Sequence, residues 1–167
     1  TLQEKMDSIL FSLPLIEQDK AAGWRIAFLR DWLSHPVRDQ FWKKTSIGAG
    51  NYEKIEASTC NIGGWYDIVL GTTIANYMKM TGEDIPPGIR KKQKLLIGPW
   101  VHSWGKQFVG ELDFGEEAAF NGREHRLRWF DSQLKGMDNG IITEPPVKIF
   151  VMGANKWRFE NEWPPAR

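Results

Sequence analysis

The chain has 167 residues, about the length of one domain, and its 22 Lys and Arg against 21 Asp and Glu leave a formal net charge of +1. These charges are scattered rather than clustered, so neither a nucleic acid nor an anionic membrane surface is expected as a partner. One cysteine and three histidines exclude a disulfide framework and a zinc-type ligand cluster, and no metal or cofactor is therefore expected.

Residues 1 to about 45 carry only helical patterns. Apolar residues recur at helical spacing up to Pro14, which predicts a helix that ends there. A second apolar stripe follows Gly23 and stops before Pro36. Pro36 is then predicted to open a shorter third helix, with Phe41 and Trp42 on its apolar face.

The pattern changes at residue 55, where a strand is predicted to run through Ile62 and to lead into a glycine-rich loop. A helix follows, with Thr72 or Thr73 as its predicted cap and Gly82 at its end. A compact apolar run at 95–97 predicts a second, buried strand. Strand, helix and strand in this order form a βαβ unit, which implies parallel strands in a sheet covered by helices.

The segment 98–115 is rich in glycine and aromatic residues and is predicted to be a long ordered loop of the kind that carries function. A charged helix is predicted at about 116–135, with Gly136 as its C-terminal cap. Its predicted apolar face consists of Leu127, Phe130 and Leu134. Two strands are predicted to close the chain, one at 147–152 and one through 157–159.

Two titratable residues follow the first two predicted strands, Asp67 after one and His102 after the other. Catalytic groups in open parallel sheets lie beyond the carboxyl ends of the strands, so both residues are predicted at one rim. A carboxylate bonded to one imidazole nitrogen fixes the tautomer and stabilises the imidazolium formed at the other. The pair therefore fits an orienting acid and a general base, although spacing alone more often marks solvated or capping residues.

Six short motifs occur in order from residue 63 onward. They are Gly63-Gly64-Trp65-Tyr66-Asp67, Gly98-Pro99-Trp100-Val101-His102, Asp113-Phe114-Gly115, Trp129-Phe130-Asp131, Leu134-Lys135-Gly136 and Pro146-Val147-Lys148-Ile149-Phe150-Val151-Met152-Gly153. Together they resemble the family of X-prolyl dipeptidyl peptidases and related acyl esterases, and look closest to its cocaine-esterase and glutaryl-acylase branch. The resemblance covers essentially the whole chain.

The resemblance implies an α/β fold built from parts of three domains. It implies a helical cap segment at 1–50, the C-terminal part of an α/β-hydrolase domain at 51–142, and the first strands of a β jelly roll at 143–167. It also places the triad acid on Asp67 and the triad base on His102.

Four residues near this pair are candidate substrate-pocket residues. They are Trp65, Tyr66, Val69 and Trp100. Aromatic and aliphatic side chains beside a strand end are more often core packing, which stays the alternative for these positions.

The nucleophile motif of the family, Gly-x-Ser-x-Gly, does not occur in the sequence, and none of the seven serines follows a glycine two residues earlier. Family order puts the nucleophile before the cap, so the chain is expected to be an interior fragment of a serine hydrolase and inactive alone. Its expected partners are the missing N-terminal and C-terminal parts and a small ester, amide or peptide substrate. The alternative is a degenerate binding or structural module that retains the scaffold without the chemistry.

The other candidates for chemistry have simpler interpretations. Cys60 lies within a predicted strand and is expected to be a small buried hydrophobe rather than a nucleophile. His35 and His125 are expected to be surface or capping residues. No apolar run approaches the roughly 18 residues of a membrane helix, so the stretch is expected to be soluble. Substrate identity, oligomeric state and a cytoplasmic or exported location stay open.

Overall fold

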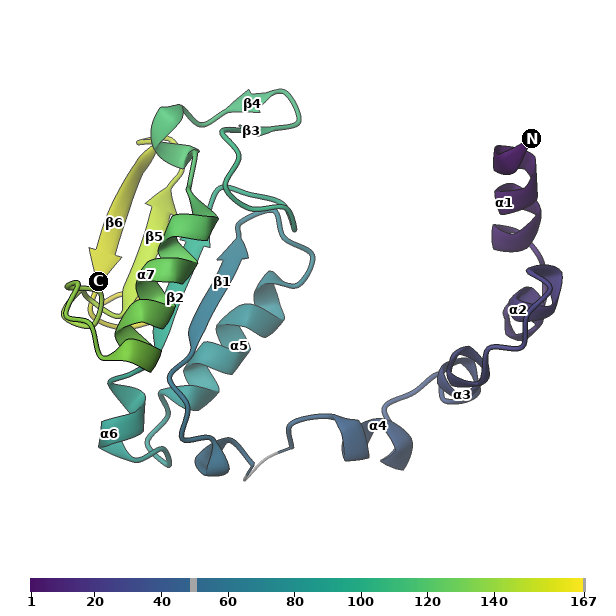
Figure 1. The fold of residues 1–167 in the computed structure, drawn as a ribbon, viewed down its shortest axis with the longest axis horizontal. Coiled ribbons are helices and arrows are strands. Elements are labelled where there is room, and N and C mark those ends of the chain that lie inside the picture. Colours follow the sequence, from purple (N-terminus) through teal and green to yellow (C-terminus); the bar gives the residue numbers. More distant parts are fainter. Residues whose placement is uncertain (49–50, 167) are drawn as a thin grey trace. The chain divides into compact units, whose positions relative to one another are not determined.

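A computed structural model describes residues 1–48 and 51–166, which divide near residue 50 into two units. The first unit is helical and the second is built on a sheet (Figure 1). The helices of the first unit are α1 (Leu2–Leu10), α2 (Gln18–Ala21), α3 (Ala27–Ser34) and α4 (Gln40–Thr45). The prediction that this part of the chain holds helices only is confirmed for the residues described.

The start of α4 differs from its predicted start at Pro36. The helix begins at Gln40 because the carboxylate of Asp39 accepts a hydrogen bond from the backbone N–H of Phe41 at 2.9 Å and caps the first turn. The side chain of an aspartate at the N-cap accepts a hydrogen bond from a free backbone N–H of the first turn. A proline side chain has no acceptor and cannot do this. The sequence pattern identified the helix but not the residue that opens it.

A buried ion pair joins α2 to α3 in the helical unit. The side chain of Asp19 has no exposed surface and accepts hydrogen bonds from Nε and Nη2 of Arg30 at 2.7 and 2.5 Å. It also accepts the backbone N–H of Ile26 at 3.0 Å, just before α3. These bonds, with Arg30 as the largest cause, lower the pKa of Asp19 to about 2. No residue of α1, α3 or α4 is buried, so Asp19 is the one buried residue in the four helices of this unit.

The second unit contains a four-stranded sheet in the order β1-β2-β5-β6 (Figure 1). Its strands are β1 (Cys60–Gly64), β2 (Lys94–Gly98), β5 (Val147–Val151) and β6 (Lys156–Glu160). The first three are parallel, and β6 returns antiparallel to β5 after a turn at Gly153. The predicted βαβ unit is confirmed, with α5 (Leu70–Met80) as the crossover between β1 and β2.

Neighbouring residues of the strands pack on opposite faces of the sheet. Ile149 belongs to a cluster with Tyr77 of α5, whereas Phe150 packs with Phe114 and Ala118 on the other face. This alternation follows from the two-residue period of a strand. A parallel sheet covered on both faces is the ordinary solution for an α/β fold.

Residues 147–160 differ from the expectation of a separate β domain that starts at 143. Val147 pairs with Leu95 in a parallel ladder, so β5 and β6 complete the same sheet as β1 and β2. Both Ile149 and Phe150 are buried, as in a strand covered on both faces. A short apolar run reads the same in a parallel sheet and in a sandwich, and for this reason the pattern did not separate the two.

The charged helix α7 (Gly122–Lys135) also differs in part from its prediction. It begins after a 3₁₀ turn at Glu116–Ala118, and Gly136 at φ 67° is its C-terminal cap as predicted. The buried positions are Trp129 and Ser132. The predicted apolar face is mostly exposed at Leu127, Phe130 and Leu134, by 55, 51 and 77%. The large Trp129 side chain, one residue from Phe130, fixes which side of the helix meets the sheet.

The remaining elements are short. They are α6 (Pro87–Arg90) before β2, and a two-stranded hairpin of β3 (Phe108–Val109) and β4 (Leu112–Asp113). The hairpin lies within the segment 98–115, which was expected to be a loop. Among the described residues, none of the helices is both long and apolar enough to span a bilayer.

Candidate active site

Two glycines at the ends of β1 and β2 leave room for the close approach of Trp100. Gly64 and Gly98 are register partners at these ends. A Cβ on Gly64 would lie 2.0 Å from the carbonyl oxygen of Trp100, and one on Gly98 would lie 2.5 Å from the Trp100 ring. No side chain fits at such distances, so glycine is required by the close approach of the backbone. The glycines thereby fix where the two following loops begin.

The loop after β1 is tied to the loop after β2 by backbone hydrogen bonds. The N–H of Trp65 donates to the carbonyl of Gly98 at 2.8 Å, and the N–H of Tyr66 donates to that of Trp100 at 3.0 Å. The next residue is Asp67, and its N–H donates back to the carbonyl of Gly64 at 3.0 Å. The carboxylate of Asp67 therefore lies on a short turn that is hydrogen-bonded to the end of β2 and to the loop that follows it.

Asp67 and His102 meet beyond the carboxyl ends of the two strands. Nδ1 of His102 lies 3.0 Å from Oδ1 and 3.2 Å from Oδ2 of Asp67. Oδ1 also accepts the backbone N–H of Val69 at 2.9 Å, which holds the carboxylate at the entry to α5. Neither Thr72 nor Thr73, the predicted caps, opens this helix, because it begins earlier at Leu70.

The two partners differ sharply in exposure. The Asp67 side chain is 6% exposed and the His102 side chain 70%. Nε2 of His102 has no hydrogen-bond partner within 1–48 and 51–166. A buried acid on one nitrogen and an open second nitrogen is the arrangement in which an imidazole can accept a proton and have its charge stabilised.

A shallow cavity of about 440 Å³ lies beside His102. Its lining residues are His102, Ser103, Trp104, Gly122, Arg123 and Arg126. Arg126 lies over the Trp104 ring, 5.1 Å from its centroid. The sequence interpretation missed Trp104 and the two arginines, since the latter come from the first turns of α7 and carry no motif that links them to His102.

The four predicted pocket residues divide into two kinds. Trp100 is fully buried and donates its indole N–H to the carbonyl of Ala118 at 2.9 Å, so it is a core residue. Trp65 packs against the core, and its indole N–H donates to the carbonyl of Phe150 at 2.7 Å. Tyr66 and Val69, which flank Asp67, are exposed by 42 and 39%.

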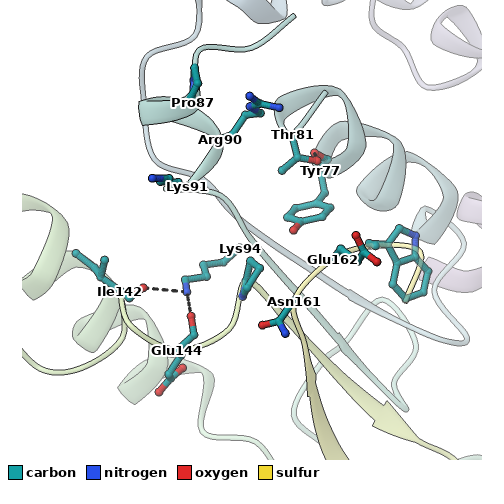
Figure 2. A pocket seen from close by; sticks show the side chains of 12 residues that line it. Tyr77, Thr81, Pro87, Arg90, Lys91, Lys94, Ile142, Glu144, Asn161 and Glu162 are labelled. Atoms are coloured by element: carbon teal, nitrogen blue, oxygen red, sulfur yellow. Dashed lines mark hydrogen bonds between the residues drawn. The ribbon is translucent and has the colours of Figure 1, made fainter. Parts of the chain in front are cut away.

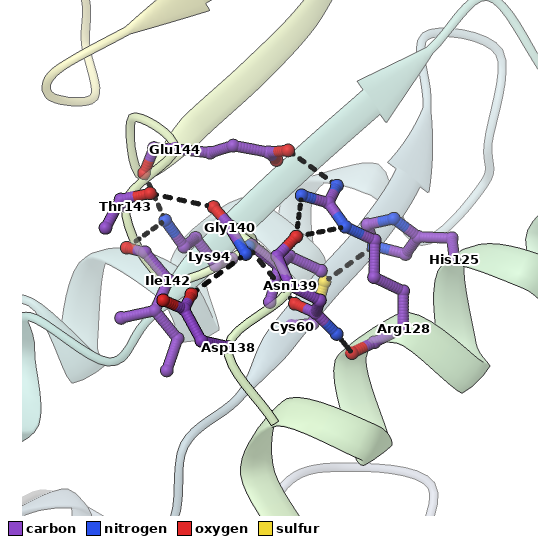
Figure 3. A network of polar contacts seen from close by, with 11 residues as sticks. Cys60, Lys94, His125, Arg128, Asp138, Asn139, Gly140, Ile142, Thr143 and Glu144 are labelled. Carbon is purple, nitrogen blue, oxygen red and sulfur yellow. Dashed lines mark hydrogen bonds and ion pairs between the residues drawn. The ribbon is translucent and has the colours of Figure 1, made fainter. Parts of the chain in front are cut away.

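Cys60 lies at the other end of β1 (Figure 3), about 13 Å along the strand from Gly64 at 3.3 Å per residue. Its Sγ is 3.6 Å from Nε2 of His125 on α7. Burial raises the pKa of the thiol to about 12, so it stays protonated near neutral pH. His125, expected at the surface or as a cap, is half-buried against it, and this burial lowers its pKa.

The polar network around Cys60 in Figure 3 holds α7 to the segment before β5. Arg128 donates to the carboxylate of Glu144 at 2.6 Å and to the carbonyl of Asn139 at 2.8 Å. The side chain of Asn139 returns a bond to the carbonyl of Arg128 at 2.7 Å. The three side-chain nitrogens of Arg128 and the side-chain nitrogen of Asn139 each donate to a protein acceptor, which indicates a structural role for this pair.

The second histidine–aspartate contact lies in the helical unit. Nδ1 of His35 is 2.5 Å from Oδ2 of Asp39, and the His35 ring stacks on Phe41 with a centroid separation of 4.3 Å. This contact lies at the entry to α4. In the part of the chain that the structure describes, no group of three or more His, Cys, Asp or Glu could hold a metal ion.

Comparisons with known proteins give one family and several relatives. The family model described as X-Pro dipeptidyl-peptidase (S15 family) matches residues 10–104. Cocaine esterase from Rhodococcus sp. (strain MB1 Bresler) is 28% identical over 159 residues, which cover 90% of this chain and 25% of the esterase. The chain thus spans about a quarter of the length of this relative.

Two solved structures share the fold. An aminopeptidase from the marine sediment archaeon Thaumarchaeota archaeon superposes with a TM-score of 0.67 at 26% identity, over 84% of this chain and 23% of its own. A CocE/NonD family hydrolase from Staphylococcus aureus gives a TM-score of 0.52 at 16% identity, over 84% of this chain and 22% of its own. The likeness to the second structure is one of fold.

Proposed function

The chain belongs to the X-Pro dipeptidyl-peptidase (S15) family, and from this membership we propose that it is part of a serine hydrolase that cleaves an ester or an amide. Its relatives include an esterase and an aminopeptidase, which supports hydrolysis of an acyl bond without choosing between the two. The observation that carries the proposal is the hydrogen bond between buried Asp67 and exposed His102 beyond two parallel strands.

The proposed mechanism assigns one role to each residue of the pair. A serine outside this chain attacks the carbonyl carbon, and Nε2 of His102 takes its proton. The imidazolium then returns that proton to the leaving alcohol or amine. Asp67 holds Nδ1 and stabilises the transient positive charge, which it does effectively because it is itself fixed by the N–H of Val69 and largely shielded from water.

The surroundings of the pair receive roles under the same proposal. Tyr66 and Val69 are exposed beside Asp67 and are proposed to contact the acyl group, whereas Trp65 and Trp100 support the strand ends from the core side. The segment 1–50 is proposed to belong to a cap domain of the hydrolase.

The test uses a longer polypeptide in which this sequence is preceded by its upstream reading frame. We expect a Gly-x-Ser-x-Gly serine there that reacts with a fluorophosphonate probe, and we expect His102→Ala to abolish this labelling while His35→Ala leaves it unchanged. Mass spectrometry of the labelled peptide identifies the serine. Labelling that persists in His102→Ala contradicts the assignment of the base.

The chain alone provides the complementary measurement. Without a nucleophile it should hydrolyse nitrophenyl acetate no faster than its imidazoles do in the unfolded chain. Turnover by the isolated chain that His102→Ala or Cys60→Ala abolishes would refute the proposal of an external serine. A longer polypeptide with no reactive serine would instead favour a degenerate binding module.

A further inference from the structure

A second cavity, of about 570 Å³, lies at the opposite ends of the strands from Asp67 and His102. Figure 2 shows the side chains that line it. Lys94, the first residue of β2, and Pro146, just before β5, form part of its wall. The lining residues on which the argument depends also include Tyr77, Arg90, Lys91, Ile142, Glu162 and Trp163. A volume of this size is typical of a site for a small organic molecule.

Tyr77 supplies a hydroxyl group that lines the cavity and has no protein partner among the described residues. The residue is 2% exposed, and its carbonyl accepts the hydroxyl of Thr81 at 2.9 Å. The phenolic hydroxyl has no hydrogen-bond partner in the described residues and is directed into the cavity toward Lys94 (Figure 2). Burial raises the pKa of this phenol to about 12, so it is a hydrogen-bond donor at neutral pH. No buried side-chain nitrogen or oxygen of the described residues lacks a partner, so this hydroxyl reaches the open space of the cavity, where it is available to a ligand.

Lys94 supplies a positive charge that is only partly compensated. Its Nζ donates to the carbonyl oxygens of Ile142, at 3.3 Å, and of Glu144. An ammonium group has three N–H donors, so one is left for the cavity. The carboxylate of Glu144 binds Arg128 instead, and burial lowers the pKa of Lys94. Two N–H donors of the Lys94 ammonium group are therefore bonded to carbonyl oxygens, and no carboxylate of the described residues is bonded to it.

The charges at the rim favour an anion with a single charge. Arg90 and Lys91 have no ion pair with any described residue, and they add to the positive potential at the cavity. Glu162 also lies at the rim and is exposed, so its carboxylate repels a bound anion, about twice as strongly when the anion carries two charges. The balance suits a monoanion better than a phosphate, which is close to doubly charged at neutral pH.

The rest of the wall is apolar. It includes Ile142, Pro146, Trp163 and the ring of Tyr77. We propose that this cavity binds a small organic carboxylate, with its carboxylate group on Lys94 and the Tyr77 hydroxyl and its hydrocarbon part against Trp163 and Pro146. The site is separate from the candidate active site and does not depend on the hydrolase chemistry.

The test is a titration of the whole chain with hexanoate, followed by the indole N–H signal of Trp163 in ¹H–¹⁵N spectra. We expect saturable binding with a Kd on the order of 1 mM, which is ordinary for a ligand of so few atoms. Hexanamide has the same size without the charge and should bind at least about tenfold more weakly. Equal binding of hexanoate and hexanamide would overturn the proposal.

Variants give opposite expected effects at the two polar ends of the site. Tyr77→Phe, which removes one hydroxyl, should weaken hexanoate binding about fivefold. Glu162→Gln, at an exposed position that does not threaten folding, should strengthen it about twofold to fivefold by removing a repulsive charge. Arg123→Gln, at the cavity beside His102, is the matched control and should leave the Kd unchanged. Hexanoate affinity that is unaltered in Glu162→Gln would refute the site even if Tyr77→Phe fails to fold.

Discussion

His35 and Asp39 lie four residues apart at the entry to α4, whereas His102 and Asp67 lie 35 residues apart and meet because β1 and β2 are parallel neighbours. Both aspartates accept a backbone N–H two residues later at 2.9 Å, from Phe41 in one case and Val69 in the other. The local turn is therefore the same in the two pairs.

Exposure is what separates the pairs. Asp39 is 37% exposed and its His35 partner stacks on Phe41, whereas Asp67 is 6% exposed and His102 is open to solvent. The hydrogen bond from His35 lowers the pKa of Asp39, as expected for a surface cap. A histidine–aspartate contact is thus no sign of catalysis by itself. A shielded acid combined with an open imidazole nitrogen is the informative feature.

The strongest test of the difference between the two pairs is to neutralise each aspartate in a longer, active polypeptide. Asp67→Asn should lower the turnover number by a factor on the order of 10⁴, because an amide favours the wrong imidazole tautomer. Asp39→Asn should change it less than about twofold, since an asparagine still caps a helix. Steady-state kinetics on a nitrophenyl ester measures both. A tenfold or smaller loss in Asp67→Asn would remove the distinction between the pairs.

The second test concerns the strand ends that support Asp67. Gly64→Ala places a methyl group 2.0 Å from the carbonyl of Trp100 and should destabilise the sheet unit by about 2–4 kcal/mol. Gly71→Ala, in α5 with nothing within 4 Å of its Cβ, should instead stabilise by about 0.4–1 kcal/mol. Urea unfolding of both variants gives the two signs. Similar midpoints for Gly64→Ala and the unsubstituted chain would mean that the strand ends are not closely packed.

The third test extends the comparison to Asp19, a shielded acid whose partner is Arg30 rather than a histidine. Its pKa of about 2 is below the ordinary 3.8, so the unfolded chain binds more protons between these values. The contribution of Asp19 to stability is then fully present above about pH 4 and is lost as the pH falls toward 2. The amide chemical shifts of α3 should change between pH 5 and 2 as this stabilisation is lost. Asp19→Asn should remove this pH-dependent step in the chemical shifts. A step that persists in Asp19→Asn must come from another group.

The placement of Asp67 and His102 together was predictable because the rule for parallel strands needs only the strand order and the residues that follow each strand. The orientation of Trp100 was not predictable in the same way. Its ring folds over Gly98, which has no Cβ, and this turns the indole into the core rather than toward the rim. The sequence shows that a glycine lies two residues before Trp100. It does not show that the Trp100 ring turns over this glycine into the space that a side chain would otherwise fill.

The same limit applies to α7 and β5. On α7, Trp129 and Phe130 are adjacent, and only the packing against the sheet decides which of the two faces inward. On β5, the apolar run is equally compatible with a sandwich and with a parallel strand, and the ladder from Leu95 to Val147 decides it. Both outcomes depend on contacts between residues far apart in the chain, which local periodicity does not contain.

The sheet order has a dynamic consequence for the proposed acid and base. Among the strands described, β2 has a neighbour on each side, whereas β1 pairs with β2 alone. An edge strand opens more readily than one bonded on both sides, so amide hydrogens near Asp67 should exchange with solvent sooner than those leading to His102. Asp67 thus follows β1, the strand that opens more readily, whereas His102 follows β2. Any segment that pairs with the outer edge of β1 would slow this opening and hold the carboxylate against the imidazole for a larger fraction of the time.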